Sequence, residues 1–107
     1  MLKNNQTIIH GVLLEEKERN LLMQEQYKKE IELLPKGSIV KKINKSGEYF
    51  YLSYRNGANV ISKYLGKDLD AINKINEKIE KRKHLKSIIK NLQLELKQIK
   101  KVVKKWT

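Results

Sequence analysis

Hydrophobic and polar positions follow two different periods along this chain. From about residue 7 or 12 to residue 34, and again from residue 68 onward, apolar side chains recur every three or four positions, as in amphipathic helices. Between residues 38 and 65 hydrophobic and polar side chains alternate, and Val, Ile and Tyr are frequent, which predicts β-strands. The pattern predicts an α+β fold: a long helix, a three-stranded antiparallel meander and a longer C-terminal helix.

Two turns set the register of the predicted sheet. Asn56-Gly57 is the strongest short hairpin signal, because both central residues of a type I′ turn need a positive φ. The second turn is the segment 44–47, which reads Asn-Lys-Ser-Gly. Strands are therefore predicted at about 38–43, 48–55 and 58–65. The expected pairs are Ile39 with Leu52, Ile43 with Glu48, Arg55 with Ala58, Leu52 with Ile61, and Tyr49 with Tyr64.

Alternation gives this sheet two faces with different chemistry. The first, called the core face, is apolar with lysines at its margins: Ile39, Lys41, Ile43, Phe50, Leu52, Tyr54, Ile61, Lys63 and Leu65. The second, called the tyrosine face, is aromatic, hydroxylic and basic and contains no acid: Val40, Lys42, Tyr49, Tyr51, Ser53, Arg55, Val60, Ser62 and Tyr64. The first helix can cover only one face, and the core face needs cover more.

Both helices have recognisable ends and an apolar stripe. Pro35 ends the first helix, because proline disfavours helical geometry in the preceding residue and has no N–H. Asp68 is the expected N-cap of the second helix. After a phase slip across residues 80–84, apolar residues recur at alternating spacings of four and three: Leu85, Ile89, Leu92, Leu96, Ile99, Val103 and Trp106. This seam predicts that the two helices pair antiparallel as a coiled coil.

The predicted first helix is shorter than the second. In the antiparallel pair it is expected to end opposite a position near Leu96 of the second helix. The remaining seam then has no partner within the chain. An apolar stripe without cover indicates a second copy or another protein. A homodimer or a protein partner is expected to bind through Leu96, Ile99, Val103 and Trp106.

Composition and charge narrow the class of protein. A chain of 107 residues forms one domain, here divided into a helix over 1–35, a β module over 36–67 and a basic helix over 68–107. The net charge of +12 is concentrated after residue 35 and favours polyanionic partners. The absence of cysteine excludes disulfides and thiolate metal sites. No long apolar run indicates a membrane span, and a cytoplasmic protein is expected.

The sequence contains no recognisable catalytic or cofactor site. His10 and His84 belong to separate segments and are expected on helix surfaces. Asp68 and Asp70 are better explained by helix capping than by metal binding. The glycines do not form a phosphate-binding loop. We therefore expect a protein that is not an enzyme and that binds neither cofactor nor metal.

The module PKGSIVKKI…EYFYLSYRNG…VISKYLGK resembles short proteins of unknown activity from bacteria and their mobile elements. The resemblance covers about residues 33–105. More generally, the segment is similar to the arm-type DNA-binding domains of tyrosine recombinases and to the front end of some transposases. In those domains a three-stranded sheet enters the major groove. The resemblance to short proteins implies no activity, whereas the resemblance to arm-type domains implies DNA binding.

Two functions fit these patterns. The first is binding of DNA, RNA or a nucleoprotein. Phosphates would be contacted by basic side chains of the β module: Lys41, Lys42, Lys45, Arg55 and Lys63. Tyr49, Tyr51 and Tyr64 would stack on bases, although the same tyrosines could serve only as cross-strand packing. The second is a coiled-coil interaction protein from a phage or mobile element, which would inhibit a host defence nuclease in the manner of an anti-CRISPR.

Overall fold

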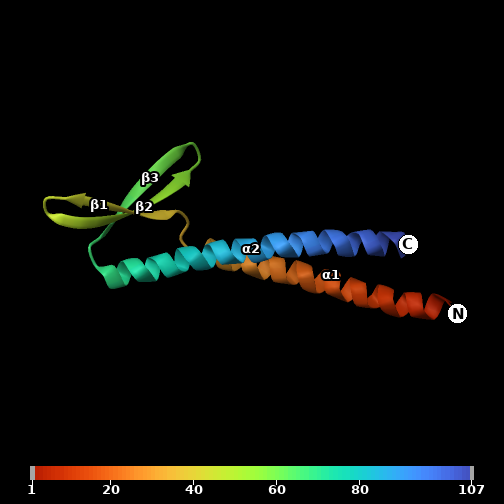
Figure 1. Cartoon of the computed structure of the whole chain (residues 1–107). Helices are drawn as coiled ribbons and strands as arrows, with labels where there is room; N and C mark the ends of the chain where they lie inside the picture. The colour runs from red at the N-terminus through yellow and green to blue at the C-terminus, as the bar shows by residue number, and fades with distance from the viewer. Residues whose placement is uncertain (1, 107) are drawn as a thin grey trace. The chain divides into compact units, whose positions relative to one another are not determined.

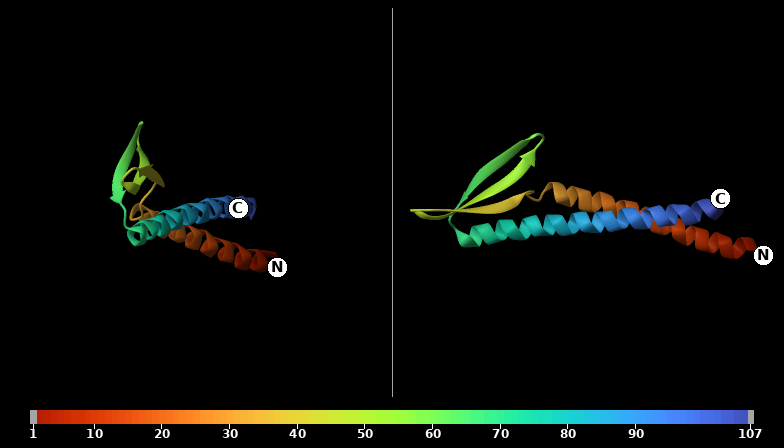
Figure 2. Two further views of the ribbon diagram at one scale, coloured as in Figure 1. Left: turned by 60° about the vertical axis from the view of Figure 1, so that its left-hand side comes forward. Right: turned by 45° about the horizontal axis from the view of Figure 1, so that its top comes forward.

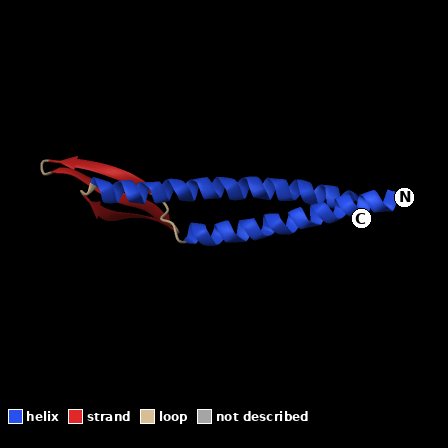
Figure 3. Cartoon of the chain, turned by 90° about the horizontal axis from the view of Figure 1, so that it is seen from below, coloured by secondary structure: helices blue, strands red, loops and turns tan. Residues whose placement is uncertain are grey.

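The computed structural model describes the backbone of residues 2–106 and the side chains of residues 8–105. It confirms the predicted α+β order of elements (Figures 1 and 3). The elements are α1 (Leu2–Glu32), β1 (Ser38–Asn44), β2 (Gly47–Asn56), β3 (Asn59–Gly66) and α2 (Leu69–Trp106). They form two compact units: a helical unit of residues 1–31 with 85–107, and a sheet unit of residues 32–84.

Helix α1 is longer at its start than the sequence indicated. It begins at Leu2, whereas the predicted start was residue 7 or 12, because residues 1–7 are polar and Gly11 left the start open. A single glycine lowers helix stability by only about 1 kcal/mol relative to alanine, and the surrounding turns tolerate it. The helix ends at Glu32 rather than Leu34, because the proline ring disfavours helical geometry in the residue before it.

In the helical unit, α1 and the part of α2 from Leu85 run side by side in opposite directions (Figures 1 and 2). The Asn20 side chain donates a hydrogen bond to the Leu92 carbonyl oxygen, 2.9 Å away on the other helix. The predicted seam of α2 is buried along most of its length: Leu85, Ile89, Leu92, Leu96 and Ile99. The antiparallel arrangement is thus present within this unit, and its regular coiled-coil packing stays a prediction.

The prediction that the end of the seam lacks cover within the chain was wrong for Leu96 and Ile99. Leu96 and Ile99 are each only 8% exposed. The ten residues before Val12 continue α1 as helix, so the start of α1 and the end of α2 lie at the same end of the helical unit (Figure 2). The error came from the late predicted start of α1, which made the first helix too short to reach the last turns of α2.

The start of α2 is capped as the sequence predicted. The Asp68 carboxylate accepts hydrogen bonds from the backbone N–H groups of Asp70 and Ala71, at 3.0 and 3.5 Å. The N–H of Ile72 donates to the Asp68 carbonyl oxygen at 3.0 Å, which closes the first helical turn. The side-chain oxygen therefore satisfies amide groups that have no partner inside the helix.

The phase slip in α2 coincides with the boundary between the two units. Ile79 and Leu85 are 2% and 6% exposed, yet they are six residues apart rather than the seven of a heptad. Arg82 lies between them, is half-buried, and its buried Nε atom has no hydrogen-bond partner among the described residues. An arginine therefore occupies the position where the apolar stripe loses its period.

The sheet has the order β1-β2-β3. Its first hairpin has the predicted register, with Ile39 opposite Leu52 and Ile43 opposite Glu48. In the turn, the Asn44 side-chain oxygen accepts a hydrogen bond from the Ser46 N–H at 2.8 Å. Short side chains that bond the backbone two residues ahead are typical of such turns.

The second hairpin has a different register from the predicted one. Asn56 pairs with Asn59 and Arg55 with Val60, so the turn consists of Gly57-Ala58 instead of Asn56-Gly57. Only Gly57 has a positive φ there, +63°, as expected for a type II′ turn, in which glycine takes the first central position. Tyr51, not Tyr49, is then opposite Tyr64. The two-residue shift keeps every side chain before the bulge on its predicted face.

The core face is less buried than predicted. Leu52 is the one strand residue of the described sheet that is buried, at 8% exposure. Phe50, Tyr54 and Ile61 are half-buried, whereas Ile43, beside the first turn, is 71% exposed. The core of the sheet is therefore centred on the middle of β2 and does not reach the tip of the first hairpin.

Candidate nucleic-acid interface

The tyrosine face of the sheet combines side chains from all three strands. Residues opposite one another in an antiparallel ladder lie on the same face, so Lys42 shares a face with Tyr49, and Tyr51 with Tyr64. Arg55 lies on this face near the second turn and is exposed. The strand residues of the tyrosine face include no Asp or Glu.

Two lysine ammonium groups lie over tyrosine rings on this face. The Nζ atom of Lys42 is 4.6 Å from the centroid of the Tyr51 ring. The Nζ atom of Lys67 is 4.4 Å from the centroid of the Tyr49 ring. Both distances are within the range in which the ring quadrupole attracts a cation. The two positive charges are thus held in defined places at the surface of the sheet.

The three tyrosine rings form one cluster. The Tyr51 and Tyr64 rings are 5.3 Å apart and meet edge to face, and the Tyr49 and Tyr64 rings are 6.3 Å apart and tilted. Such geometries are favourable for aromatic pairs. Tyr49 and Tyr51 are half-buried, whereas Tyr64 is 54% exposed. Cross-strand packing therefore explains part of the cluster, and Tyr64 is its most accessible ring.

Lys67 joins the first turn to the end of β3. Its ammonium group donates a hydrogen bond to the Ser46 carbonyl oxygen at 3.4 Å. Hydrogen bonding from the Ser46 side chain, and then the Lys67 ammonium, lower the pKa of the Tyr49 phenol below its usual value. These contacts favour the phenolate form of Tyr49, because a donor or a positive charge nearby stabilises the negative oxygen.

Lys67 was not among the predicted site residues, and the reason is a β-bulge. Tyr51 pairs with Tyr64 but Phe50 pairs with Gly66, so Leu65 is an extra residue in β3. Strict alternation would have placed Lys67 on the core face, and the extra residue moves it to the tyrosine face. Gly66, with φ of +99°, was the available signal, because glycine inside a strand often marks a bulge.

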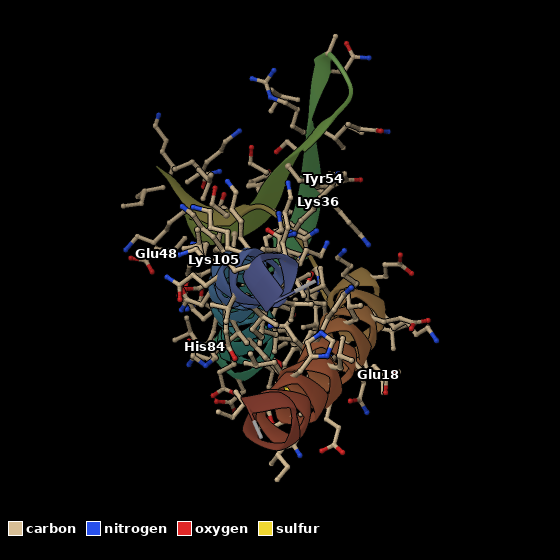
Figure 4. The ribbon with its side chains drawn as sticks, turned by 90° about the vertical axis from the view of Figure 1, so that its right-hand side faces the viewer. Glu18, Lys36, Glu48, Tyr54, His84 and Lys105 are labelled. Carbon is tan, nitrogen blue, oxygen red and sulfur yellow. The ribbon has the colours of Figure 1, made fainter. Side chains whose placement is uncertain are left out.

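Three other predicted phosphate contacts lie elsewhere. Lys41 is on the core face, where its ammonium group forms an ion pair with Glu48 at 3.2 Å (Figure 4 labels Glu48). Lys63 is exposed and is opposite Leu52, also on the core face. Lys45 is exposed in the first turn. Of the predicted basic residues, the structure thus gathers Lys42 and Arg55 on the tyrosine face and adds Lys67.

The core face carries a weaker lysine and tyrosine contact. The Nζ atom of Lys36 is 6.0 Å from the centroid of the half-buried Tyr54 ring (Figure 4). This distance is at the outer limit for a cation–π interaction. The two closer contacts, 4.6 and 4.4 Å, are both on the tyrosine face.

The predicted partner-binding residues of α2 are mostly inside the helical unit. Leu96 and Ile99 are buried and Val103 is half-buried. The side chain of Trp106 lies outside the described side chains. Burial of Leu96 and Ile99 within the chain removes the observation on which a seam-mediated partner was predicted.

A comparison with models of protein families gives a match. A model for a domain of unknown function, DUF6788, matches residues 13–74, which is more than half of the chain. The chain belongs to this family. The DUF6788 match includes most of α1, the whole sheet and the first turns of α2, so the entire tyrosine face and Lys67 lie within it. No curated protein and no solved structure matches the chain.

The DUF6788 match agrees with the resemblance of the KGSI…SKYLGK module to proteins of unknown activity. The similarity to arm-type DNA-binding domains has no support among the matches. Within residues 2–106, neither helix has a stretch that is both long and apolar enough to cross a lipid bilayer. The described side chains include no group of three or more His, Asp or Glu placed to hold a metal ion.

Proposed function

We propose that this DUF6788 protein is a non-enzymatic, cytoplasmic protein that binds DNA or RNA through the tyrosine face. The observation that supports the proposal most is the pair of ammonium groups, Lys42 and Lys67, held at 4.6 and 4.4 Å over tyrosine rings on a face without acidic strand residues. Phosphates attract such groups and release counterions when they bind. Aromatic rings beside the lysines provide contacts for bases or sugars.

Simple packing of the sheet accounts for only part of this face. The edge-to-face contact between Tyr51 and Tyr64 is a common cross-strand pair. Packing does not require that the acid of the first hairpin, Glu48, be on the opposite face and paired with Lys41. It also does not require that Arg55 be on the same face as the tyrosines. The absence of acidic strand residues from this basic face therefore favours an anionic ligand over a purely structural role.

The test is a binding titration with fluorescently labelled DNA and RNA across a series of salt concentrations. We expect Lys42→Glu with Arg55→Glu to weaken binding at low salt by at least 10-fold, because each reversal replaces an attraction to phosphate by a repulsion. Circular dichroism should show an unchanged fold, since both side chains are exposed.

A matched control is Lys97→Glu with Lys101→Glu, which changes the net charge equally at two exposed positions of α2. We expect a smaller loss of affinity than for the variant of the tyrosine face. Equal losses in the two variants would mean that total charge, not this face, controls binding. No measurable binding of wild-type protein to any DNA or RNA would overturn the proposal.

A second candidate function is protein binding, and the exposed apolar side chains of the helical unit favour it. Ile8 and Leu22 on α1 are each 65% exposed, and Leu94 on α2 is 55% exposed. Exposed apolar groups often mark contacts with other proteins. In this alternative the chain comes from a phage or mobile element and inhibits a host defence nuclease, or forms a homodimer. Light scattering should then show a particle larger than 12.7 kDa.

The finer resemblance to arm-type domains is a proposal of the same kind. It would place the three-stranded sheet in the major groove of duplex DNA. Its support is the shared three-stranded architecture alone. A clear preference for duplex DNA over single strands would favour it.

A further inference from the structure

The three rings of the tyrosine face are not equivalent. A lysine ammonium group lies over the Tyr49 ring and another lies over the Tyr51 ring. Among the residues that the structure describes, no lysine or arginine lies over the Tyr64 ring in this way. Tyr64 is also the most exposed of the three, at 54%, and it contacts both other rings. One aromatic ring is thus accessible between two rings that already hold a cation.

The two lysines come from opposite edges of the sheet, and the Lys67 ammonium group reaches the first turn, where it donates a hydrogen bond to the Ser46 carbonyl oxygen. Lys42 belongs to β1, and Lys67 directly follows β3. The tyrosine cluster between them comes from β2 and β3. Each of the two rings that Tyr64 contacts has an ammonium group over it, so a base on Tyr64 would have two positive charges nearby for the phosphates of its own nucleotide and of the next one.

We propose that the ligand of the tyrosine face is single-stranded nucleic acid, with one base stacked on Tyr64 and the adjoining phosphates at Lys42 and Lys67. This inference rests on the nucleic-acid binding proposed above. A flat aromatic ring binds the face of a base, and every base has such a face, so the site is tolerant of sequence. In a duplex the base faces are covered by neighbouring pairs, and only the base edges are accessible in the grooves.

Charge alone would give the opposite preference. A duplex has a higher density of phosphates than a single strand, and each neutralised phosphate contributes more to counterion release, with salt slopes of about 0.9 and 0.7 per phosphate. A protein that binds through lysines alone therefore prefers the duplex. Tighter binding to the single strand would require a contact with unpaired bases, which Tyr64 can make.

The experiment compares three labelled probes of about 12 nucleotides: oligothymidylate, the same strand paired with oligoadenylate, and a strand of the same length in which the bases are replaced by abasic sites. We expect wild-type protein to bind oligothymidylate roughly 10-fold or more tighter than the abasic strand, and tighter than the duplex. Tyr64→Ala should lose this difference, and Tyr64→Phe, which retains the ring, should keep it. The abasic probe tests base stacking even if Tyr64→Ala fails to fold.

The outcomes separate this inference from the function on which it rests. Equal binding of all three probes, or tighter binding of the duplex, together with loss of affinity in Lys42→Glu with Arg55→Glu, would overturn single-strand recognition and leave nucleic-acid binding intact. Binding of oligothymidylate that does not change in Tyr64→Ala would assign the base contact to another residue and overturn the role of Tyr64. No binding to any probe would overturn both proposals.

Discussion

The Asn20 side chain on α1 and the Leu92 carbonyl oxygen on α2 are joined by a hydrogen bond of 2.9 Å. Asn20 is 2% exposed, and its side-chain oxygen, Oδ1, accepts a hydrogen bond from the Gln24 side-chain amide at 2.6 Å. A buried amide can satisfy its hydrogen bonds in few alignments of two helices. This contact therefore favours one register of α1 against α2 within the helical unit.

We predict that Asn20→Ala lowers the free energy of unfolding by about 1–3 kcal/mol, because it removes the bond to α2 and leaves the buried Gln24 amide without its partner. Chemical denaturation followed by circular dichroism would measure the change. Asn91→Ala is the matched control, since Asn91 is exposed on α2 and its replacement should change stability by less than about 0.5 kcal/mol. Equal effects would show that the buried hydrogen bonds contribute nothing specific.

Burial of the α2 seam within the chain gives a second prediction. Ile99→Ala should lower the free energy of unfolding by about 2–5 kcal/mol, because Ile99 is 8% exposed and its truncation leaves a cavity. Leu94→Ala, at a position that is 55% exposed, should have little effect. The loss should be independent of protein concentration. A loss that shrinks as the protein is concentrated would instead place Ile99 at an interface between copies.

Gly37 gives a third prediction, because its position combines a positive φ with close packing. Its φ is +109°, and a Cβ atom there would clash with the Ser53 carbonyl oxygen and lie 2.9 Å from the Tyr54 Cβ atom. We expect Gly37→Ala to destabilise the sheet unit by more than about 2 kcal/mol, since backbone strain and the clash with β2 add. Thermal unfolding would measure it.

Gly11 is the control for Gly37. It lies inside α1, has no positive φ, and a Cβ atom would have nothing within 4 Å. Gly11→Ala should therefore raise the free energy of unfolding by roughly 0.5–1 kcal/mol, the usual difference between glycine and alanine in a helix. A destabilised Gly11→Ala variant would contradict the continuous helix from Leu2.

The lowered pKa of Tyr49 gives a fourth prediction. In an ultraviolet pH titration, Tyr49 should form tyrosinate at lower pH than an ordinary tyrosine, because the Ser46 side chain and the Lys67 ammonium favour its phenolate form. The lowered pKa also makes the free energy of unfolding depend on pH. Because the folded state favours the phenolate, Tyr49 stabilises the folded protein once the pH is high enough for ionisation. This stabilisation disappears as the pH falls.

Ser46→Ala and Lys67→Met should each shift this early titration towards the ordinary pH range. Tyr49→Phe should remove it, which assigns the signal. If the early component survives in Tyr49→Phe, another tyrosine is responsible and the prediction for Tyr49 is wrong.

The fifth prediction concerns salt. If Lys42 and Lys67 each contact a phosphate, Lys42→Gln and Lys67→Gln should each flatten the slope of log affinity against log salt by about one. Lys63→Gln, on the core face, should leave the slope unchanged. A flattened slope in Lys63→Gln would mean that the nucleic acid also contacts the core face.

Sequence reasoning succeeded where one local rule dominated. Period-2 alternation placed all three strands, Asp68 capped α2 as expected, and the apolar spacing identified the residues that are buried from Leu85 to Ile99. Each of these features depends on a few neighbouring residues. The same holds for the first hairpin, whose turn at Asn44 fixes the register of Ile43 against Glu48.

It failed where two local rules competed. Asn56-Gly57 and Gly57-Ala58 are both acceptable hairpin turns, and the wider pairing of β2 with β3 selected the second. Gly11 could end a helix or lie within one, and in the structure it lies within α1. Lys67 was not among the predicted site residues, because a bulge beside Gly66 changes the alternation, and alternation alone cannot locate a bulge.

The ammonium groups over the Tyr49 and Tyr51 rings have a thermodynamic consequence. A free lysine side chain has about 2 kcal/mol of rotamer entropy, and a ligand that immobilises it must overcome that loss. Lys42 and Lys67 lose part of this freedom when the sheet folds, because each is held against a ring. An anion that meets this face therefore orders fewer side chains, so its association should have a smaller unfavourable entropy than association with the unrestrained lysines of a helix surface.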